Sequence, residues 1–412
     1  MNSHPGPLEP KADKASVRRH NLSLVLRAVH DAGEITRAAV AVRVGLTRAA
    51  VSSLVEQLID GGFLTESGKT FSGQAGRPGT ALRVATTGVA GLGVEVNIDY
   101  VSVCVVDLAG TDRLRLTEHG DNRGAAPAEV LAGAAAVAAR ALGEAAAQDL
   151  HPVGAQLALP GLVSGGTVRQ APNLGWNRIA AEGLFARSLT ALRTGGRPLP
   201  VGSDNEANAA ALAELWFGDA GEARSFLFLS GEIGVGGALV LDGRLLRGAH
   251  GFAGEIGHVV VDENGPECRC GARGCLEQYA GQAALLRGAG LPEDAGVRAV
   301  DELARRAAAG DARAATAAAR AGHMLGLVLS GAVNLVDPDA VVLGGVFRPL
   351  LPWLAPAADA ELTRRVVSGL WTPGGGRLRA ASPEGDAARG AAGIIAREIL
   401  ADPAAYAGIR AT

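Results

Sequence analysis

The pattern of apolar and polar positions divides the chain into two parts. In the first 85 residues, apolar side chains recur every three or four positions, which is the spacing of amphipathic helices. Beyond residue 88, apolar runs rich in valine and glycine alternate with alanine-rich stretches, as strands alternate with helices in α/β proteins. We therefore expect a small helical head followed by a larger α/β body.

The head is expected to contain three helices. A first apolar stripe covers residues 22–29. Thr36 and Thr47 can each cap a helix with the hydroxyl oxygen, which predicts a second helix over 36–42 and a third over 47–60. The buried face of the third helix would consist of Val51, Leu54, Val55, Leu58 and Ile59.

Small, polar and basic side chains gather at the start of the third helix, where the recognition helix of a winged helix-turn-helix touches base edges. A strand from Phe63 and a glycine-rich return over 66–79 follow, and they read as a wing that reaches phosphates. The candidate DNA contacts are Arg43, Thr47, Arg48, Ala49, Ser52, Ser53, Lys69 and Arg77. The alternative is a three-helix module that binds only protein, which would not need this clustering.

The body is expected to alternate strands with helices around sizeable cores, since 48% of the residues are hydrophobic. Its Ala-rich tracts read as helices rather than disordered linkers. The expected elements are a strand pair over 91–107, a helix over 126–147, strands over 153–160 and 225–230, a glycine loop over 231–237, helical structure over 300–336 and a strand over 340–345.

Charge separates the two parts. The whole chain carries a net charge of −3, which by itself argues against a nucleic-acid partner. Residues 1–83, however, hold 11 basic and 7 acidic side chains, so the remainder holds 28 basic and 35 acidic ones, and every lysine lies in the first segment. A basic head on an acidic body favours double-stranded DNA as the partner of the head.

Three of the four cysteines lie within eight positions. Cys268, Cys270 and Cys275 follow His258 in a glycine-containing loop over 258–275. One imidazole and three thiolates make a closed tetrahedral ligand set, which is typical of structural Zn²⁺ and leaves no position for an activated water. The alternative is a disulfide or unconnected buried thiols, but a Cys-x-Cys pair bridges poorly and would leave the third cysteine over.

Targeting signals are not indicated. Residues 1–15 are polar and are expected to be flexible, and no run of about 18 uncharged apolar residues occurs, so neither a signal peptide nor a membrane partner is expected. Thiolates that bind zinc need a reducing compartment, which predicts the cytoplasm.

From about residue 88 onward, the chain resembles the ROK family of sugar kinases and sugar-responsive repressors. With a winged helix in front, it resembles the repressor branch. The matching motifs lie at 172–176, 205–208, 231–237, 254–258, 268–277 and 334–345.

The resemblance implies a two-lobed, actin-like (ribonuclease H-like) sugar-kinase fold around a sugar cleft, assembled as a homodimer or homotetramer. The expected divisions are the winged head at 16–85, a first α/β lobe at 88–205 against which a C-terminal helix over about 388–402 packs, and a second lobe at 206–387 that carries the metal loop.

The sugar-binding residues that the resemblance implies are Asn205, Glu206, Glu255, His258 and Glu277. Pyranose hydroxyls donate hydrogen bonds to carboxylates, and an imidazole held by zinc keeps a fixed position. Each acid taken alone could equally be a solvated surface charge, but their joint placement in glycine-flanked motifs favours a cleft.

The phosphate loops of the family's kinases are altered. Where those kinases carry Asp-x-Gly-Gly-Thr, this chain has residues 95–99, with Asn97 and Ile98 in place of the two glycines and Asp99 where a phosphate would lie. A second loop, Gly-Thr-Gly in the family, here introduces Glu232. The family's catalytic aspartate is replaced by Glu206. These changes hinder close approach by phosphate and add like charges.

We therefore expect no enzyme activity. The chain is interpreted as a sugar-responsive transcriptional regulator that represses genes of carbohydrate uptake or catabolism by binding operator DNA. The alternatives are an ATP-dependent sugar kinase with an appended DNA-binding head and a protein-binding scaffold. The altered phosphate loops argue against the first, and the basic recognition helix argues against the second.

Overall fold

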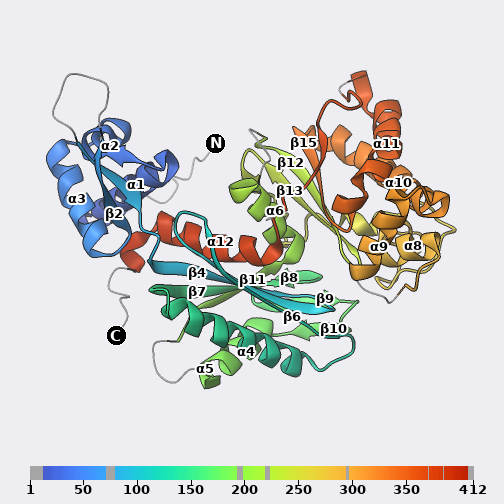
Figure 1. Ribbon diagram of the computed structural model, residues 1–412, viewed down its shortest axis with the longest axis horizontal. Coiled ribbons are helices and arrows are strands. Elements are labelled where there is room, and N and C mark those ends of the chain that lie inside the picture. The colour runs from blue at the N-terminus through green and yellow to red at the C-terminus, as the bar shows by residue number, and fades with distance from the viewer. Residues whose placement is uncertain are drawn as a thin grey trace, which may run out of the picture.

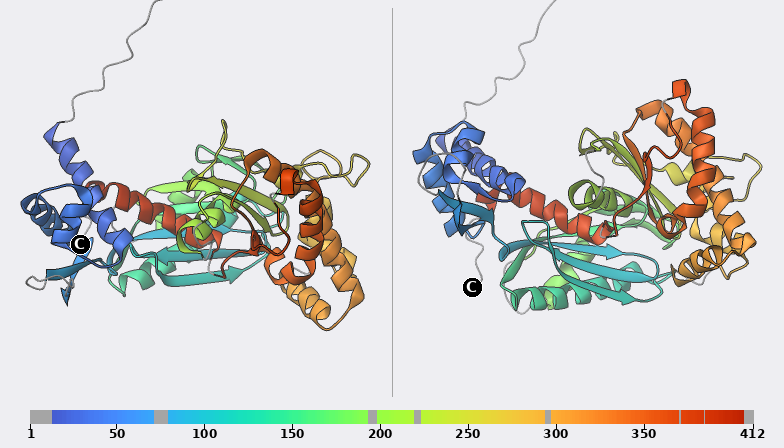
Figure 2. Two further views of the ribbon diagram at one scale, coloured as in Figure 1. Left: turned by 90° about the horizontal axis from the view of Figure 1, so that it is seen from above. Right: turned by 45° about the horizontal axis from the view of Figure 1, so that its top comes forward.

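The chain folds into a small head and two α/β lobes (Figure 1). The computed structural model describes residues 13–70, 79–192, 198–218, 223–293, 297–369, 371–383 and 385–406. Both ends of the described chain lie at the head, because the last helix returns to it from the two lobes (Figures 1 and 2).

The head has the expected three helices and a small antiparallel sheet of order β1-β3-β2. The hydroxyl oxygens of Thr36 and Thr47 accept hydrogen bonds from the N–H groups of Ala39 and Ala50, so both predicted caps are confirmed. The elements are α1 (Lys14–Ala32), β1 (Ile35–Thr36), α2 (Arg37–Val44), α3 (Arg48–Asp60), β2 (Leu64–Thr70) and β3 (Gly79–Val84).

Two details of the head differ from the prediction. Helix α2 continues to Val44 rather than ending at 42, because Gly45, with φ of 70°, supplies the left-handed residue that ends it. Ile59 was expected in the buried face of α3 but is only partly buried, because it lies at the edge of the apolar cluster that contains Leu58.

The first lobe is a five-stranded sheet of order β11-β7-β4-β5-β6. Helix α4 packs on one face together with α5, and α12 packs on the other (Figure 1). The elements are β4 (Gly88–Val96), β5 (Tyr100–Val106), β6 (Asp112–His119), α4 (Pro127–Ala146), β7 (Leu150–Leu159), β8 (Leu162–Ser164), β9 (Thr167–Ala171), β10 (Trp176–Ile179), α5 (Ala181–Leu192) and β11 (Val201–Asn205).

The second lobe is built on a sheet of order β14-β13-β12-β15-β16, with most of its helices gathered beside it (Figure 1). The loop expected over 231–237 is shorter than predicted: residues 232–234 connect two paired strands, whereas Gly231 ends the first strand and residues 235–237 begin the second. The elements are α6 (Glu206–Phe217), β12 (Phe226–Gly231), β13 (Val235–Leu241), β14 (Arg244–Leu245), α7 (Glu277–Ala280), α8 (Gln282–Ala289), α9 (Val297–Ala308), α10 (Ala312–Val336), β15 (Ala340–Gly345), α11 (Phe347–Arg365) and β16 (Leu378–Ala380).

Helix α10 is apolar because it lies in the core of this lobe. Among the described residues it is the single unbroken helix long and apolar enough to cross a membrane. It packs along α11, and a Cβ at Gly322 would lie 2.1 Å from the carbonyl oxygen of Leu354, so glycine permits this close contact. Leu325 and Leu329 are fully buried in the same core.

Helix α12 (Ala387–Ala401) connects the two lobes with the head (Figure 2). Its first half lies on β4, where a Cβ at Gly93 would come within 1.9 Å of the carbonyl oxygen of Ala388. Its second half belongs to the hydrophobic core of the head, to which it contributes Ile399 and Leu400. The head therefore does not have a separate core of its own.

Polar contacts fix the same junction between α12 and the head. The Ser23 hydroxyl of α1 donates to the carbonyl oxygen of Leu400 over 3.1 Å, and Arg19 forms an ion pair with Asp402. Movement of α12 relative to the lobes would therefore move the head.

Candidate ligand cleft and metal centre

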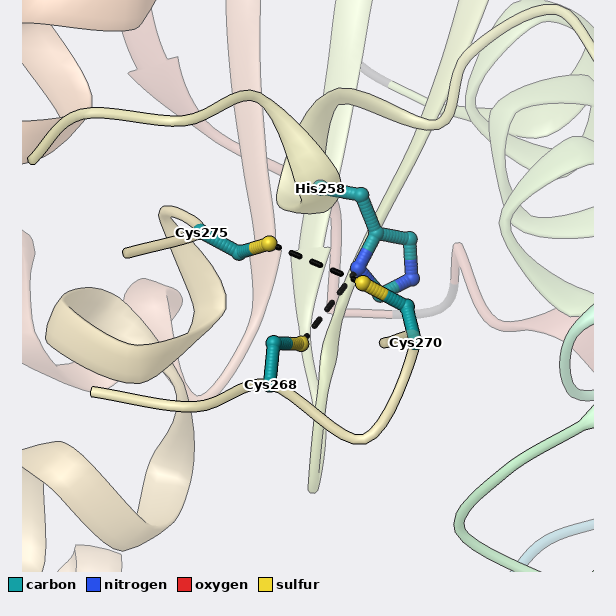
Figure 3. Close-up of side chains that lie close together, drawn as sticks. All are labelled: His258, Cys268, Cys270 and Cys275. Atoms are coloured by element: carbon teal, nitrogen blue, oxygen red, sulfur yellow. Dashed lines mark hydrogen bonds between the residues drawn. The ribbon is translucent and has the colours of Figure 1, made fainter. Parts of the chain in front are cut away.

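His258 and three cysteines converge in the second lobe (Figure 3). Their ligand atoms all lie within 4.8 Å of one another. The Sγ atoms of Cys270 and Cys275 are 3.7 Å apart, and Cys268 Sγ is 3.8 Å from His258 Nδ1. Two sulfurs that each lie about 2.3 Å from a tetrahedral metal are separated by about 3.8 Å, so the spacing fits one ion.

The same distances do not fit a disulfide. A sulfur–sulfur bond is about 2.05 Å long, and all four cysteines of the chain are free. The loop that carries the thiols can fold back tightly because Gly274 has φ of 67° and a Cβ there would collide with the carbonyl oxygen of Asp262 at 1.6 Å. The four residues therefore form a cluster that could hold a metal ion.

A cleft lies beside this cluster and between the two lobes, and residues of both lobes line it. All five residues expected to bind sugar line it: Asn205, Glu206, Glu255, His258 and Glu277. The structure thus brings together residues from the start of α6, from the turn before the metal loop and from the start of α7.

Asn205 holds the start of α6 in place. Its Oδ1 accepts from the N–H groups of Ala207 and Asn208 over 2.8 and 3.2 Å, and its Nδ2 donates to the carbonyl oxygen of Gly161 over 2.9 Å. The side chain therefore keeps little hydrogen-bonding capacity for a ligand, and its main effect is to aim Glu206 into the cleft.

Three acids with raised pKa values lie near one another: Glu206 and Glu232 line the cleft, and the buried Glu95 lies beside it. Burial raises the pKa of Glu206 to about 8, with Glu95 and Glu255 as further causes. Burial also raises the pKa of Glu95 to about 7 and holds the pKa of Glu232 well above its usual range. Glu206 Oε2 has no hydrogen-bond partner among the described residues. These groups are acceptors when ionised and donors when protonated.

Glu95 is a further acid at the cleft, beyond the predicted sugar-binding residues. Its carboxylate accepts a hydrogen bond of 2.6 Å from the Tyr100 hydroxyl and one from the backbone N–H of Ala388, the second residue of α12. A glutamate within the otherwise apolar strand β4 is the signal that identifies such a group. Glu95 thus lies between the start of α12, to which it is hydrogen-bonded, and Glu206 of the cleft, whose pKa its charge raises.

Two further acids join the cleft to the metal cluster. Glu277 Oε2 accepts from the N–H of Val235 over 3.2 Å, and its Oε1 lies 3.9 Å from Cys268 Sγ. The Nε2 atom of His258 lies 3.8 Å from Glu255 Oε2, whereas its Nδ1 faces the thiols. A metal that holds His258 would thereby also fix the geometry of the cleft.

The phosphate loops are filled by this chain's own groups. Asn97 and Ile98 are each 3% exposed, and Asn97 Oδ1 accepts from the N–H of Ile98 over 2.7 Å. The N–H of Glu232 is bonded to the carbonyl oxygen of Gly234. Asp99, expected to face a phosphate, lies in the turn after β4 and is not among the residues that line the cleft.

The candidate DNA contacts that the structure describes differ in their exposure. Ser52 is partly buried, and Arg43 is exposed with its guanidinium 3.9 Å from Asp31. Lys69 belongs to β2, and Arg77 lies outside the described residues. The exposed side chains at the start of α3 are Thr47, Arg48, Ala49 and Ser53.

A helical head in front of two α/β lobes that enclose such a cleft defines a protein with a sugar-kinase fold and an added domain. The chain belongs to the ROK family, whose model matches residues 91–398. A putative xylose repressor of Caldicellulosiruptor sp. is 31% identical over 347 residues, 80% of this chain and 84% of that one. The xylose repressor of Bacillus subtilis is 28% identical, with 87% and 90% covered.

Solved structures confirm the fold. A ROK family transcriptional regulator, described as a homolog of the Escherichia coli MLC protein, superimposes with a TM-score of 0.75 at 24% identity over 93% of this chain and 97% of that one. A ROK glucokinase from Streptomyces griseus gives a TM-score of 0.62 at 24% identity over 74% of this chain and 98% of that one. The kinase matches the body, whereas the regulator also matches the head.

Proposed function

We propose that this protein is a DNA-binding transcriptional regulator that responds to a sugar and represses genes of carbohydrate uptake or catabolism. The observation that carries the proposal is the head, in which a capped α3 presents Thr47, Arg48 and Ser53 to solvent. Relatives named xylose repressors align over 80% or more of this chain, whereas a glucokinase of Halalkalibacterium halodurans aligns over 47% of it.

The proposed effector site is the cleft between the lobes. A sugar there would donate hydroxyl protons to Glu255 and Glu277 and would exchange hydrogen bonds with Glu206, whose protonation can adjust to either role. The proposed resident metal is Zn²⁺, held by His258 and the three cysteines, because a closed set of nitrogen and thiolate ligands suits zinc. Such thiolates need a reducing compartment, so the proposed location is the cytoplasm.

Helix α12 is the proposed route from the cleft to the head. Glu95, between the acids of the cleft and the start of α12, would respond when a sugar closes the lobes. The far end of α12 carries Ile399 and Leu400 within the core of the head. The sugar would then shift an equilibrium between two placements of the head, by as much as its affinities for the two states differ.

The proposed assembly is a homodimer or homotetramer. Two heads related by a two-fold axis would read two half-sites of an operator, which is how helix-turn-helix dimers bind DNA. A change in the spacing of the heads would then alter affinity for the operator without any change in α3 itself.

Replacing Arg48 by alanine is expected to relax sequence preference. The side chain is exposed at the start of α3, and loss of a contact to a base edge costs about 1–3 kcal/mol at the specific site only. Lys69→Ala and Arg77→Ala, which remove candidate phosphate contacts, should weaken specific and random DNA alike and flatten the salt dependence. The measurement is fluorescence anisotropy with DNA selected by the protein and with a scrambled duplex, at several salt concentrations.

The control for this experiment is Arg298→Ala, which removes an exposed arginine from α9 in the second lobe. It should change neither affinity nor the salt slope. Equal losses on selected and scrambled DNA for Arg48→Ala would refute its assignment to base contacts.

A further inference from the structure

The polar lining of the cleft is dominated by carboxyl groups. Four carboxyl groups line it, and an ionised carboxylate only accepts hydrogen bonds. The Nδ2 groups of Asn205 and Asn97 already donate to the carbonyl oxygen of Gly161 and to the Tyr100 hydroxyl. A sugar, however, has hydroxyl oxygens and a ring oxygen that accept. A guanidinium, which stays charged, would donate to these oxygens whatever the protonation state of the acids.

Arg269 supplies such a donor. It lies between two candidate metal ligands, Cys268 and Cys270, and it is the single arginine among the described residues that line the cleft. Its Nη1 donates to Asn173 Oδ1 over 3.1 Å, and no other hydrogen bond of this side chain occurs among the described residues. A guanidinium has five N–H donors, so most of them remain available.

The hydrogen bond to Asn173 connects the two lobes at the cleft. Asn173 lies in the turn between β9 and β10 of the first lobe, whereas Arg269 comes from the metal loop of the second lobe. The Nδ2 group of Asn173 is also close to the backbone of Gly234, where an added Cβ would lie 3.3 Å from it. The pair thus holds the two lobes together beside the acids.

The metal loop fixes the backbone of Arg269. The N–H of Cys268 donates to the carbonyl oxygen of Ala272 over 2.8 Å, and the N–H of Gly271 donates to that of Cys268 over 3.0 Å. A metal held by the cysteines on either side would further restrain the backbone from which the Arg269 side chain extends. The loop therefore presents a donor to the cleft as well as placing His258.

We propose that Arg269 is a sugar-contacting residue, which donates hydrogen bonds to hydroxyl or ring oxygens of the effector and, with Asn173, closes the cleft over it. This inference rests on the proposed sugar site. Because the contact between the lobes must open before the ligand leaves, the pair acts on the residence time of the sugar as well as on its recognition.

The test is sugar affinity of the full-length protein, measured by isothermal titration calorimetry with D-xylose, D-glucose and N-acetylglucosamine. Arg269→Ala should weaken binding about tenfold or more, as expected for loss of a hydrogen bond from a charged donor. The sugar affinity of Arg269→Lys should lie between those of the wild-type protein and Arg269→Ala, because lysine keeps the charge but not the planar guanidinium. Asn173→Ala should weaken binding less, and the double variant should bind no more weakly than Arg269→Ala alone.

Arg273→Ala is the matched control. It removes an exposed arginine from the same loop, paired with Glu267 and absent from the cleft lining, so affinity should stay within about twofold. Metal content must be equal in all variants. Wild-type sugar affinity in Arg269→Ala, or equal losses of affinity in Arg269→Ala and Arg273→Ala, would overturn the role of Arg269 but not the proposed sugar site. A wild-type protein that binds none of the three sugars would instead contradict the proposed sugar site.

Discussion

No sugar phosphate is expected when the purified protein is incubated with Mg²⁺-ATP and a sugar that it binds. Phosphoryl transfer depends on a preorganised cradle of backbone N–H groups and cations around the phosphates. Here Asn97 and Ile98 fill one phosphate loop with buried side chains. The N–H of Glu232 in the second loop is bonded within its own turn, and its carboxyl group lies among other acids.

Restoring the family's catalytic aspartate should not restore turnover. Glu206→Asp shortens the side chain but leaves both phosphate loops as they are, and a base without positioned phosphates has nothing to act on. The measurement is sugar phosphate formation by phosphorus NMR or a coupled assay, in the preparation that binds sugar by calorimetry. Turnover at an ordinary kinase rate of about 1 per second or more would make the protein a kinase with an appended head.

Replacing Cys275 by serine is expected to remove the metal and to damage the cleft. The thiol is fully buried and lies 3.7 Å from Cys270 Sγ, so serine would leave a three-ligand site in a closed loop. Because His258 and Glu277 contact the same cluster, loss of the metal should lower sugar affinity roughly 10- to 100-fold. The temperature of unfolding should fall as well.

The metal prediction is checked by elemental analysis, thermal unfolding and calorimetry. The wild-type protein should contain about one zinc per chain. Cys104→Ser is the matched control, because this buried cysteine lies in β5 of the first lobe and outside the cluster, so metal content should not change. Metal-free protein that binds sugar with wild-type affinity would contradict the proposed link between the metal and the cleft.

Local signals were enough to predict much of the head and of the cleft. The caps at Thr36 and Thr47 depend on side chains three residues from their partners, so sequence alone identifies them. The acids Glu206, Glu255 and Glu277 could be predicted to share one cleft because each lies in a glycine-flanked motif that matches the same family.

The remaining features depend on contacts between distant parts of the chain. Ser23 and Leu400 are separated by 377 positions, and no local pattern indicates that α12 completes the core of the head. The raised pKa values of Glu95 and Glu206 likewise come first from burial and then from nearby acids that are distant in sequence, Asp386 for Glu95 and Glu95 and Glu255 for Glu206. The loop over 231–237 was predicted too long because glycines mask the strand pattern at both of its ends.

The most direct test of the account is the affinity of the protein for operator DNA with and without saturating sugar. Labelled DNA selected by the protein is titrated in an anisotropy assay, with wild-type protein and with Glu206→Ala. We expect sugar to change wild-type affinity by about fivefold or more, and Glu206→Ala to bind DNA normally but to lose the response. Specific DNA binding that is identical with and without a sugar bound to the wild-type protein would contradict the account.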